Sequence, residues 1–155
     1  RGETFVTKKI IQGLIRIKQG YQKKLFLGNL YSKRDWGHAR DYVEAMWKML
    51  QQKKPEDFVI GTGKTFTIKD FVNRAAKKIR LDIKWIGKGI KEKAVNTKTK
   101  KIIIECRPRY FRPLEVDYLK SNALRAKKIL KWYPKISIDN LIDEMIQHEL
   151  KNSYD

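Results

Sequence analysis

The sequence predicts a mixed α/β fold in a single domain, residues 1–155, from three observations. The chain has 155 residues, 41% of them hydrophobic, which is enough for one core of its own. Stretches with apolar residues at helical spacing alternate with short apolar runs of the kind that form buried strands. No segment of roughly 20 to 50 residues recurs along the chain, so a repeat architecture is excluded.

The first two predicted elements are a helix and a strand. Residues 3–19 carry apolar side chains along one broad face, and Glu3 at the start suits the N-terminal end of a helix. Gly20 is expected to end this helix. Residues 25–27 are a short apolar run that stops at Gly28, which predicts a buried strand.

A second helix and a second strand are expected next. A polar loop, residues 30–37, leads to a stretch with helical apolar spacing at residues 38–51, and Pro55 follows as a stop signal. Residues 58–60 are apolar and are followed by Gly61, so they predict the next strand.

Thr67 is expected to cap a third helix that extends to about residue 79. Asp70 stands three positions after it and supplies the acidic half of a capping box. The stretch 87–101 is rich in glycine and lysine and is interpreted as an exposed loop. Residues 102–106 predict a strand.

The last part of the chain predicts two helices after a proline-bracketed loop at residues 108–113. The first of these helices covers residues 122–130. The second is expected to begin at a cap formed by Ser137 or Asp139 and to extend to about residue 151.

The net charge of +19 raises the alternative of a nucleic-acid-binding module. Of the 36 basic residues, 26 are lysine, and they are scattered over the predicted helix faces rather than gathered in an arginine-rich stripe. No named nucleic-acid-binding motif is present. The composition therefore disfavours this alternative without excluding it.

Cys106 is the single cysteine of the chain, so an internal disulfide and a cysteine-only metal cluster are excluded. This usage favours a reducing compartment, and we expect a cytoplasmic protein with an inert thiol. No apolar run is long enough for a membrane span. We therefore expect a soluble protein without a membrane partner.

Arginines beside aromatic residues occur in the loops at residues 34–38 and 107–115, and Arg1 opens the chain. The fixed fork of a guanidinium suits a phosphate, and an aromatic neighbour offers a face to a base or a sugar. The pattern indicates a converging site for an anionic, ring-bearing ligand. Taken singly, each pair is also compatible with a surface stack or with core packing.

The histidines and Asp41 have simpler interpretations. His38 and His148 are too few and too far apart for a metal site, so roles at helix ends or at the surface are expected. Asp41, near the start of its helix, is expected to compensate the helix dipole or to cap the helix rather than to act as an acid catalyst.

Three strings give the chain a family resemblance: RGETFVTKKI at 1–10, LGNLYSKRDWGHARDYVEAMW at 27–47 and PRYFRPLEVDYL at 108–119. They closely resemble the GDP-mannose 4,6-dehydratases, members of the extended short-chain dehydrogenase/reductase group. The resemblance implies a two-part enzyme with an NADP-binding Rossmann domain and a smaller C-terminal domain that holds GDP-mannose. The present chain would be the C-terminal substrate-binding part, with the Rossmann half missing, and it has no GxGxxG turn that could cradle a dinucleotide.

The resemblance also implies roles for individual residues. Arg1 corresponds to an arginine that contacts NADP. Val6 and Lys9 correspond to positions that line the nucleotide pocket, with Lys9 a candidate for the guanine edge.

Three further residues are implied for the rest of the nucleotide. Arg34 and Arg112 correspond to arginines that bind the diphosphate, and Glu115 to a glutamate that binds the ribose hydroxyls. A guanidinium suits a diphosphate and a carboxylate suits a diol. These roles therefore agree with the anionic, ring-bearing ligand that the residue types of the loops indicate. We expect these three side chains to converge on one pocket.

By this resemblance the full-length enzyme converts GDP-D-mannose to GDP-4-dehydro-6-deoxy-D-mannose with bound NADP, as a homo-oligomer, either a dimer or a tetramer. The catalytic Thr, Glu and YxxxK residues of the family would lie outside the chain, which is therefore expected to have no catalytic residue and no activity alone. Apolar parts of the first helix around Phe5 and Ile10 would lose their cover and be exposed. The alternative within the same group is another GDP-sugar dehydratase, epimerase or reductase.

Overall fold

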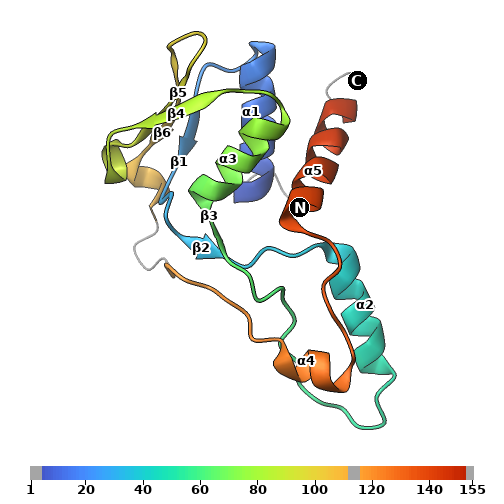
Figure 1. Ribbon diagram of the computed structural model, residues 1–155. Coiled ribbons are helices and arrows are strands. Elements are labelled where there is room, and N and C mark those ends of the chain that lie inside the picture. Colours follow the sequence, from blue (N-terminus) through green and yellow to red (C-terminus); the bar gives the residue numbers. More distant parts are fainter. Residues whose placement is uncertain (1–4, 112–115, 153–155) are drawn as a thin grey trace.

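The computed structural model of the chain describes residues 5–111 and 116–152 (Figure 1). It contains helices and short strands in mixed order, as the sequence predicts. The helices and strands are α1 Val6–Gln19, β1 Leu25–Leu27, β2 Lys33–Arg34, α2 Ala39–Leu50, β3 Phe66–Thr67, α3 Ile68–Lys78, β4 Ile83–Ile86, β5 Lys93–Asn96, β6 Ile102–Cys106, α4 Leu124–Ile129 and α5 Ile138–Asn152. Two 3-10 turns, η1 Gly89–Lys91 and η2 Pro108–Tyr110, complete the described structure.

The main sheet has the strand order β1-β6-β5-β4. β1 and β6 are parallel, with Leu25 opposite Ile104, whereas β5 is antiparallel to both of its neighbours. Helices α1, α3 and α5 gather on one side of this sheet and contact one another (Figure 1). A second, two-stranded sheet pairs β2 with β3 and lies between this upper part and the lobe that α2 and α4 form.

The larger core lies between the sheet and the three helices. Ile10 and Leu14 of α1, Phe71 of α3 and Ile142 of α5 are fully or almost fully buried there. The expectation that Ile10 is exposed is therefore wrong, because its side of α1 faces the core of this chain. Phe5, directly before α1, is half exposed, as expected.

A smaller core holds the lobe of α2 and α4 together, and Trp132 is its largest buried side chain. The Trp132 indole Nε1 donates to the backbone oxygen of Asp41, 2.8 Å away. The buried Asp41 carboxylate accepts from the backbone N–H groups of Lys135 and Ile136, each at 3.0 Å. Asp41 does stand in the first turn of α2, but its carboxylate also joins the helix to the segment after α4.

The predicted helix ends are largely confirmed. Thr67 and Asp70 form the reciprocal capping box of α3, and Gly20 adopts the left-handed conformation after α1 with φ 86°. His38 Nδ1 accepts from the backbone N–H of Arg40 and caps α2, so His38 has the expected role at a helix end. Of the two candidate caps of α5, Ser137 is the one that accepts from a backbone N–H, that of Asn140.

The strands of the structure differ from the expectations in three places. The stretch 87–101 is not a loop: it contains β5, in which the buried Ala94 lies opposite Trp85 of β4 and Ile104 of β6. The lysines on either side of this short strand make the composition of the stretch resemble that of an exposed loop. Residues 58–60 pair with no described strand and so are not assigned as one. The short pair β2 and β3 was not predicted, because two residues carry too little periodicity.

Cys106 ends β6 and is half-buried. Burial, and secondarily the nearby Glu92 carboxylate, raises the pKa of its thiol. This agrees with the expectation of an inert cysteine. Within residues 5–111 and 116–152, no helix has the length and apolar character that crossing a bilayer requires.

Candidate functional site

A cavity of about 560 Å³ opens at the carboxyl ends of the parallel strands β1 and β6. This edge of a parallel pair is where α/β proteins commonly bind ligands. The cavity brings together three of the residues implied by the resemblance, Val6, Lys9 and Arg34. Its complete lining is Phe5, Val6, Lys9, Leu27, Gly28, Asn29, Arg34, Trp36, Ile68, Arg109 and Tyr110.

Lys9 and Tyr110 form one wall of the cavity. The Lys9 ammonium lies 3.8 Å from the centroid of the Tyr110 ring, and the Arg109 guanidinium lies 5.1 Å from the same centroid. Burial, together with the nearby positive charge of Arg109, holds the pKa of Lys9 below its ordinary value, although Tyr110 acts in the opposite direction. Two cations beside one aromatic ring favour an anion in the cavity.

Gly28 sets the distance between β1 and η2. A Cβ atom at this position would lie 2.2 Å from the backbone oxygen of Tyr110 and 2.8 Å from its carbonyl carbon. Only a residue without a side chain permits this approach. Gly28 therefore fixes where Tyr110, and with it Lys9, stands in the cavity.

Arg34, in β2, also lines the cavity. Its Nη1 donates to the backbone oxygen of Lys33 at 2.8 Å and to that of Val116 at 2.6 Å. Pairing of β2 with β3 places Arg34 opposite Phe66. Backbone oxygens therefore hold the guanidinium at the cavity.

Asp35, next to Arg34, locks the loop that carries the arginine. Its carboxylate accepts five hydrogen bonds, from the backbone N–H and hydroxyl of Thr62, the N–H of Gly63, and the N–H and hydroxyl of Ser121. Burial alone raises the pKa of Asp35, but the hydrogen bonds from Ser121, Thr62 and Gly63 outweigh it and lower the pKa below its ordinary value. The ionised carboxylate therefore joins three segments that are distant in sequence.

Trp36, the next residue, closes the cavity toward the core. Its ring centroid lies 5.1 Å from that of Phe71, with the planes tilted by 59°. Such a tilted arrangement is a favourable one for two aromatic rings. Trp36 thus connects the cavity wall to α3.

Three of the implied site residues, Arg1, Arg112 and Glu115, lie outside the described residues. The expected convergence of Arg34, Arg112 and Glu115 therefore stays a prediction. The described chain resumes at Val116, whose backbone oxygen accepts from Arg34.

Sequence reasoning did not single out Asn29 or Ile68 as cavity residues. Asn29 Nδ2 donates to Asp117 at 3.2 Å, and its Oδ1 accepts from the N–H of Tyr31 at 2.9 Å, so it shapes the loop after β1. Its place directly after a strand and a glycine was the available signal. Ile68 comes from the first turn of α3, and nothing local in the sequence relates it to β1.

Sequence reasoning also did not identify Glu92, a buried carboxylate in the stretch 87–101 that was expected to be a loop. It is 2% exposed, and it accepts from the Tyr31 hydroxyl and the Lys69 ammonium at 2.6 Å each. Burial acts to raise the pKa of Glu92, but these two hydrogen bonds lower it overall. The cluster joins η1 and β5 to α3 and to the loop after β1, outside the cavity described above.

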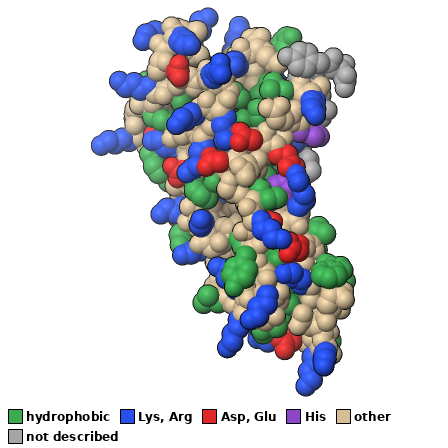
Figure 2. Space-filling model, turned by 45° about the vertical axis from the view of Figure 1, so that its right-hand side comes forward, with side chains coloured by type: hydrophobic (Ala, Val, Ile, Leu, Met, Phe, Trp, Pro, Cys, Tyr) green, Lys and Arg blue, Asp and Glu red, His purple; other side chains and the backbone are tan. Residues whose placement is uncertain are grey.

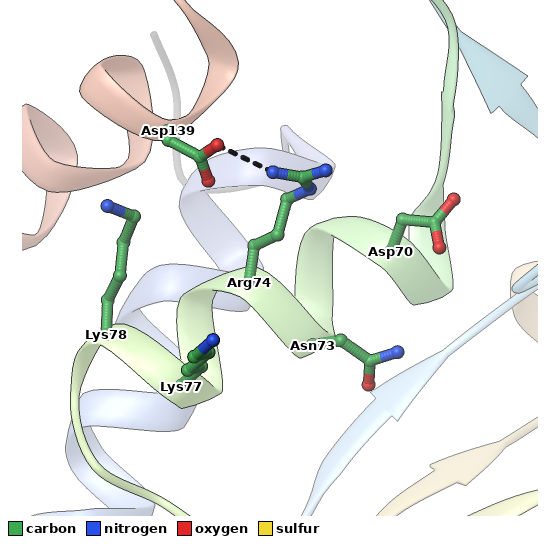
Figure 3. Close-up of a pocket in the computed structure, with 6 residues that line it drawn as sticks. All are labelled: Asp70, Asn73, Arg74, Lys77, Lys78 and Asp139. Atoms are coloured by element: carbon green, nitrogen blue, oxygen red, sulfur yellow. Dashed lines mark hydrogen bonds and ion pairs between the residues drawn. The ribbon is translucent and has the colours of Figure 1, made fainter.

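A second cavity, of about 710 Å³, lies between α3 and the start of α5 (Figure 3). Its polar groups take part in packing contacts. Arg74 of α3 pairs with Asp139 of α5 at 2.6 Å, and Asn73 of α3 accepts from the indole of Trp85 in β4 at 2.7 Å. None of the implied site residues lines it. We therefore assign this cavity to helix packing.

Both histidines line a third cavity, of about 400 Å³, between α1 and α5. His38 Nε2 lies 3.3 Å from a carboxylate oxygen of Glu144, while its Nδ1 caps α2. Among the described residues, no group of three or more His, Cys, Asp or Glu side chains is placed to hold a metal ion.

Solved structures of longer proteins share the fold of this chain. Similar folds occur in the protein RMD from Pseudomonas aeruginosa, complexed with NADPH (TM-score 0.78, 16% identity, 98% of this chain and 44% of that one), and in the dTDP-glucose 4,6-dehydratase of Bacillus anthracis, in complex with NAD (TM-score 0.73, 20% identity, 99% and 41%). The fold is thus that of the extended short-chain dehydrogenases/reductases, of which the chain represents one part.

Sequence comparison identifies the family. The family model described as GDP-mannose 4,6 dehydratase matches residues 1–145. The GDP-mannose 4,6-dehydratases of Dictyostelium discoideum and Drosophila melanogaster are 49% and 45% identical over 151 residues, 97% of this chain in each case. The chain belongs to the GDP-mannose 4,6-dehydratase family. It spans 42% and 38% of the lengths of these two relatives.

Proposed function

We propose that this chain provides the GDP-sugar-binding part of a GDP-mannose 4,6-dehydratase, which converts GDP-D-mannose to GDP-4-dehydro-6-deoxy-D-mannose. The observation that carries the proposal is the cavity that gathers Val6, Lys9 and Arg34, in a chain that belongs to this family. Binding of the nucleotide far from the reacting carbons of the sugar supplies the energy that positions them.

The cavity suggests how the nucleotide is divided among the residues. Lys9, supported by the ring of Tyr110, recognises an acceptor on the guanine edge, and Val6 packs against the base. Arg34, which also lines the cavity, binds the diphosphate with its guanidinium. Arg112 and Glu115 complete the proposal with contacts to the diphosphate and to the ribose hydroxyls.

NADP is the proposed cofactor, and this chain does not fit it by itself. The sequence contains no GxGxxG turn, so its backbone offers no cradle for the pyrophosphate. Arg1 is the one residue proposed to contact NADP. The catalytic Thr, Glu, Tyr and Lys are likewise assigned to polypeptide outside this chain, so we expect no dehydration of GDP-mannose by the 155 residues alone.

We propose a homo-oligomer, a dimer or a tetramer, for the longer enzyme, and a cytoplasmic location. A different GDP-sugar enzyme of the same group would use the same cavity, and its product would differ. A nucleic-acid-binding module is the alternative from another class, and the net charge of +19 is the observation in its favour. DNA binding by such a module would fall steeply as salt rises, whereas GDP binding in a cavity changes far less.

Titration calorimetry with GDP tests the proposed site. We expect weak but measurable binding, because Val6, Lys9 and Arg34 line the cavity in this chain. Arg34→Ala and Arg112→Ala are each expected to weaken binding by about 1.5 to 3 kcal/mol, the scale of a charge-assisted contact. Lys127→Ala, in α4 and away from the cavity, serves as the control and should leave the affinity unchanged.

Two results would contradict the proposed function. One is GDP binding that ignores both arginine substitutions. The other is binding of random DNA that exceeds GDP binding at moderate salt. Arg34→Lys refines the assignment, because it keeps the charge but loses the planar fork, so an intermediate affinity is expected.

A further inference from the structure

Lys9 differs from other lysines of the chain in its surroundings. Lys24, Lys69 and Lys78 each pair with a carboxylate, at 2.7, 2.6 and 2.5 Å respectively. The Lys9 ammonium lies instead 3.8 Å from the centroid of the Tyr110 ring, and no carboxylate pairs with it in the part of the chain that the structure describes. Lys9 is thus a half-buried amine without the counter-ion that stabilises the charge of these other lysines.

The protonation of Lys9 differs accordingly. Burial lowers its pKa, and Arg109 acts in the same direction, against an opposing effect of Tyr110. The pKa of Lys69 is raised instead, chiefly by its hydrogen bond with Glu92. A desolvated lysine beside another cation is a typical activated nucleophile, because a larger share of it is the neutral amine.

The cavity around Lys9 favours a reagent that carries a phosphate. Arg34 and Arg109 line it together with Lys9, and none of the described lining residues is acidic. A guanidinium binds phosphate oxygens with its planar fork, so either arginine can retain the anionic end of a small molecule. The cavity volume of about 560 Å³ leaves room for such a molecule. A carbonyl group attached to the bound phosphate is then confined to the cavity that contains the amine.

We propose that Lys9 is a modification site, whose amine takes the acyl group from small acyl phosphates that enter the cavity. In this step a C–N bond forms between the Lys9 nitrogen and the carbonyl carbon, and the bond from that carbon to the phosphate oxygen breaks. The phosphate leaves with the bonding electron pair, and the proton that the nitrogen loses passes to solvent. The product is an amide without positive charge.

Acylation of Lys9 would act on nucleotide binding, a consequence that rests on the proposed function. The amide lacks the charge of the ammonium, and its acyl group occupies space in the cavity that is proposed for the guanine. The acylated chain is therefore expected to bind GDP about 10-fold more weakly, or less.

Accessibility alone does not distinguish Lys9 from the other lysines. Figure 2 shows lysine and arginine side chains spread over the visible face of the molecule, and 26 of the 155 residues are lysine. Lys8 is the closest match to Lys9, because it is half-buried in the same helix, α1. It lines the third cavity, between α1 and α5, where the described lining includes two carboxylates and no arginine. Any selectivity for Lys9 over Lys8 therefore reports on the surroundings of the amine.

Mass spectrometry after brief exposure of the chain to acetyl phosphate tests the proposal. Fragment spectra distinguish Lys8 from Lys9, so the two amines are compared within the same molecules. We expect acetylation of Lys9 to be about 10-fold or more faster than that of Lys8, because the neutral amine and the bound phosphate both favour it. Equal rates at the two lysines would overturn the proposal.

A variant and a second acyl donor test the role of the phosphate. Arg109→Ala is expected to slow acetylation of Lys9 about 5-fold or more and to leave Lys8 unchanged, since Lys8 lies outside the cavity. The rate at Lys8 also reports whether the variant remains folded. A neutral acetyl ester such as p-nitrophenyl acetate should show a smaller preference for Lys9. An equal preference with both donors would overturn the assignment to acyl phosphates.

Protection by GDP separates the modification from the proposed function. Saturating GDP is expected to protect Lys9 from acetyl phosphate and to leave the rate at Lys8 unchanged. Fast acetylation of Lys9 that GDP does not slow would count against the proposed nucleotide site and not against the modification. Slow acetylation of Lys9 in a chain that binds GDP would count against the modification alone.

Discussion

Gly28→Ala is expected to lower the free energy of unfolding by about 3 kcal/mol, at the upper end of the cost of overpacking. The added methyl group would lie 2.2 Å from the backbone oxygen of Tyr110, and a backbone atom cannot rotate out of the way. Either β1 or η2 must then move. Urea denaturation of the chain and its variant measures the difference.

Gly37→Ala is the matched control for Gly28→Ala. A Cβ atom at position 37 would also lie 2.2 Å from the nearest atom. That atom is the hydroxyl oxygen of Tyr42, at the end of a side chain. A side chain can turn away at moderate cost, so we expect a clearly smaller loss of stability. Equal losses in the two variants would show that the approach of η2 to β1 is not a rigid constraint.

The Gly28 substitution should also weaken GDP binding, although glycine offers the ligand no side chain. Movement of η2 displaces Tyr110, whose ring lies 3.8 Å from the Lys9 ammonium. Calorimetry at a temperature where the variant remains folded separates this effect from the loss of stability. Unchanged affinity in the folded variant would mean that Tyr110 does not position Lys9.

Asp35→Asn is expected to destabilise the chain by about 2 to 3 kcal/mol, because a charged acceptor of five partly buried hydrogen bonds is replaced by a neutral amide. The amide nitrogen is itself a donor and would face donors on Thr62 or Ser121. Thermal or urea unfolding at neutral pH measures the loss.

The same substitution predicts a pH dependence. The pKa of Asp35 is lower in the folded chain than in an unfolded one, so its contribution to stability is complete above the unfolded pKa of about 4. This contribution is lost as the pH falls through the lower, folded pKa. The stability difference between the native chain and Asp35→Asn should therefore shrink below about pH 4.

Asp82→Asn provides the control for Asp35. The Asp82 carboxylate lies 3.8 Å from the Lys98 ammonium, and its side chain is 64% exposed. An exposed pair of this kind contributes little, so this variant should unfold like the native chain. A stability difference for Asp35→Asn that is constant from pH 7 to well below the folded pKa would contradict the role of the ionised carboxylate.

Local signals in the sequence were sufficient for much of the fold. Gly20, the Thr67 and Asp70 pair and the apolar run 102–106 each act through neighbours a few residues away, and the structure has the elements they predict. β5 was missed because its identity depends on partners: Ala94 becomes a core residue only when Trp85 and Ile104 lie beside it. Residues 58–60 show the opposite case, since apolar composition alone does not supply a partner strand.

The cavity could be predicted only in part, and for the same reason. Family resemblance indicated Val6, Lys9 and Arg34, which the structure brings together. The place of Ile68 in the cavity and the hydrogen bonds of Asp35 both depend on contacts between segments that are far apart in sequence. No local pattern in the sequence indicates such contacts.

The parallel pairing of β1 with β6 also bears on how the chain folds. Leu25 lies opposite Ile104, so the cavity at the ends of these strands is absent until a long stretch of chain has closed into a loop. Loop closure of this kind is slow compared with helix formation. Before that closure, the helices can form but the cavity cannot. A ligand that binds in this cavity, as proposed for GDP, would stabilise only molecules in which this distant strand pairing is complete.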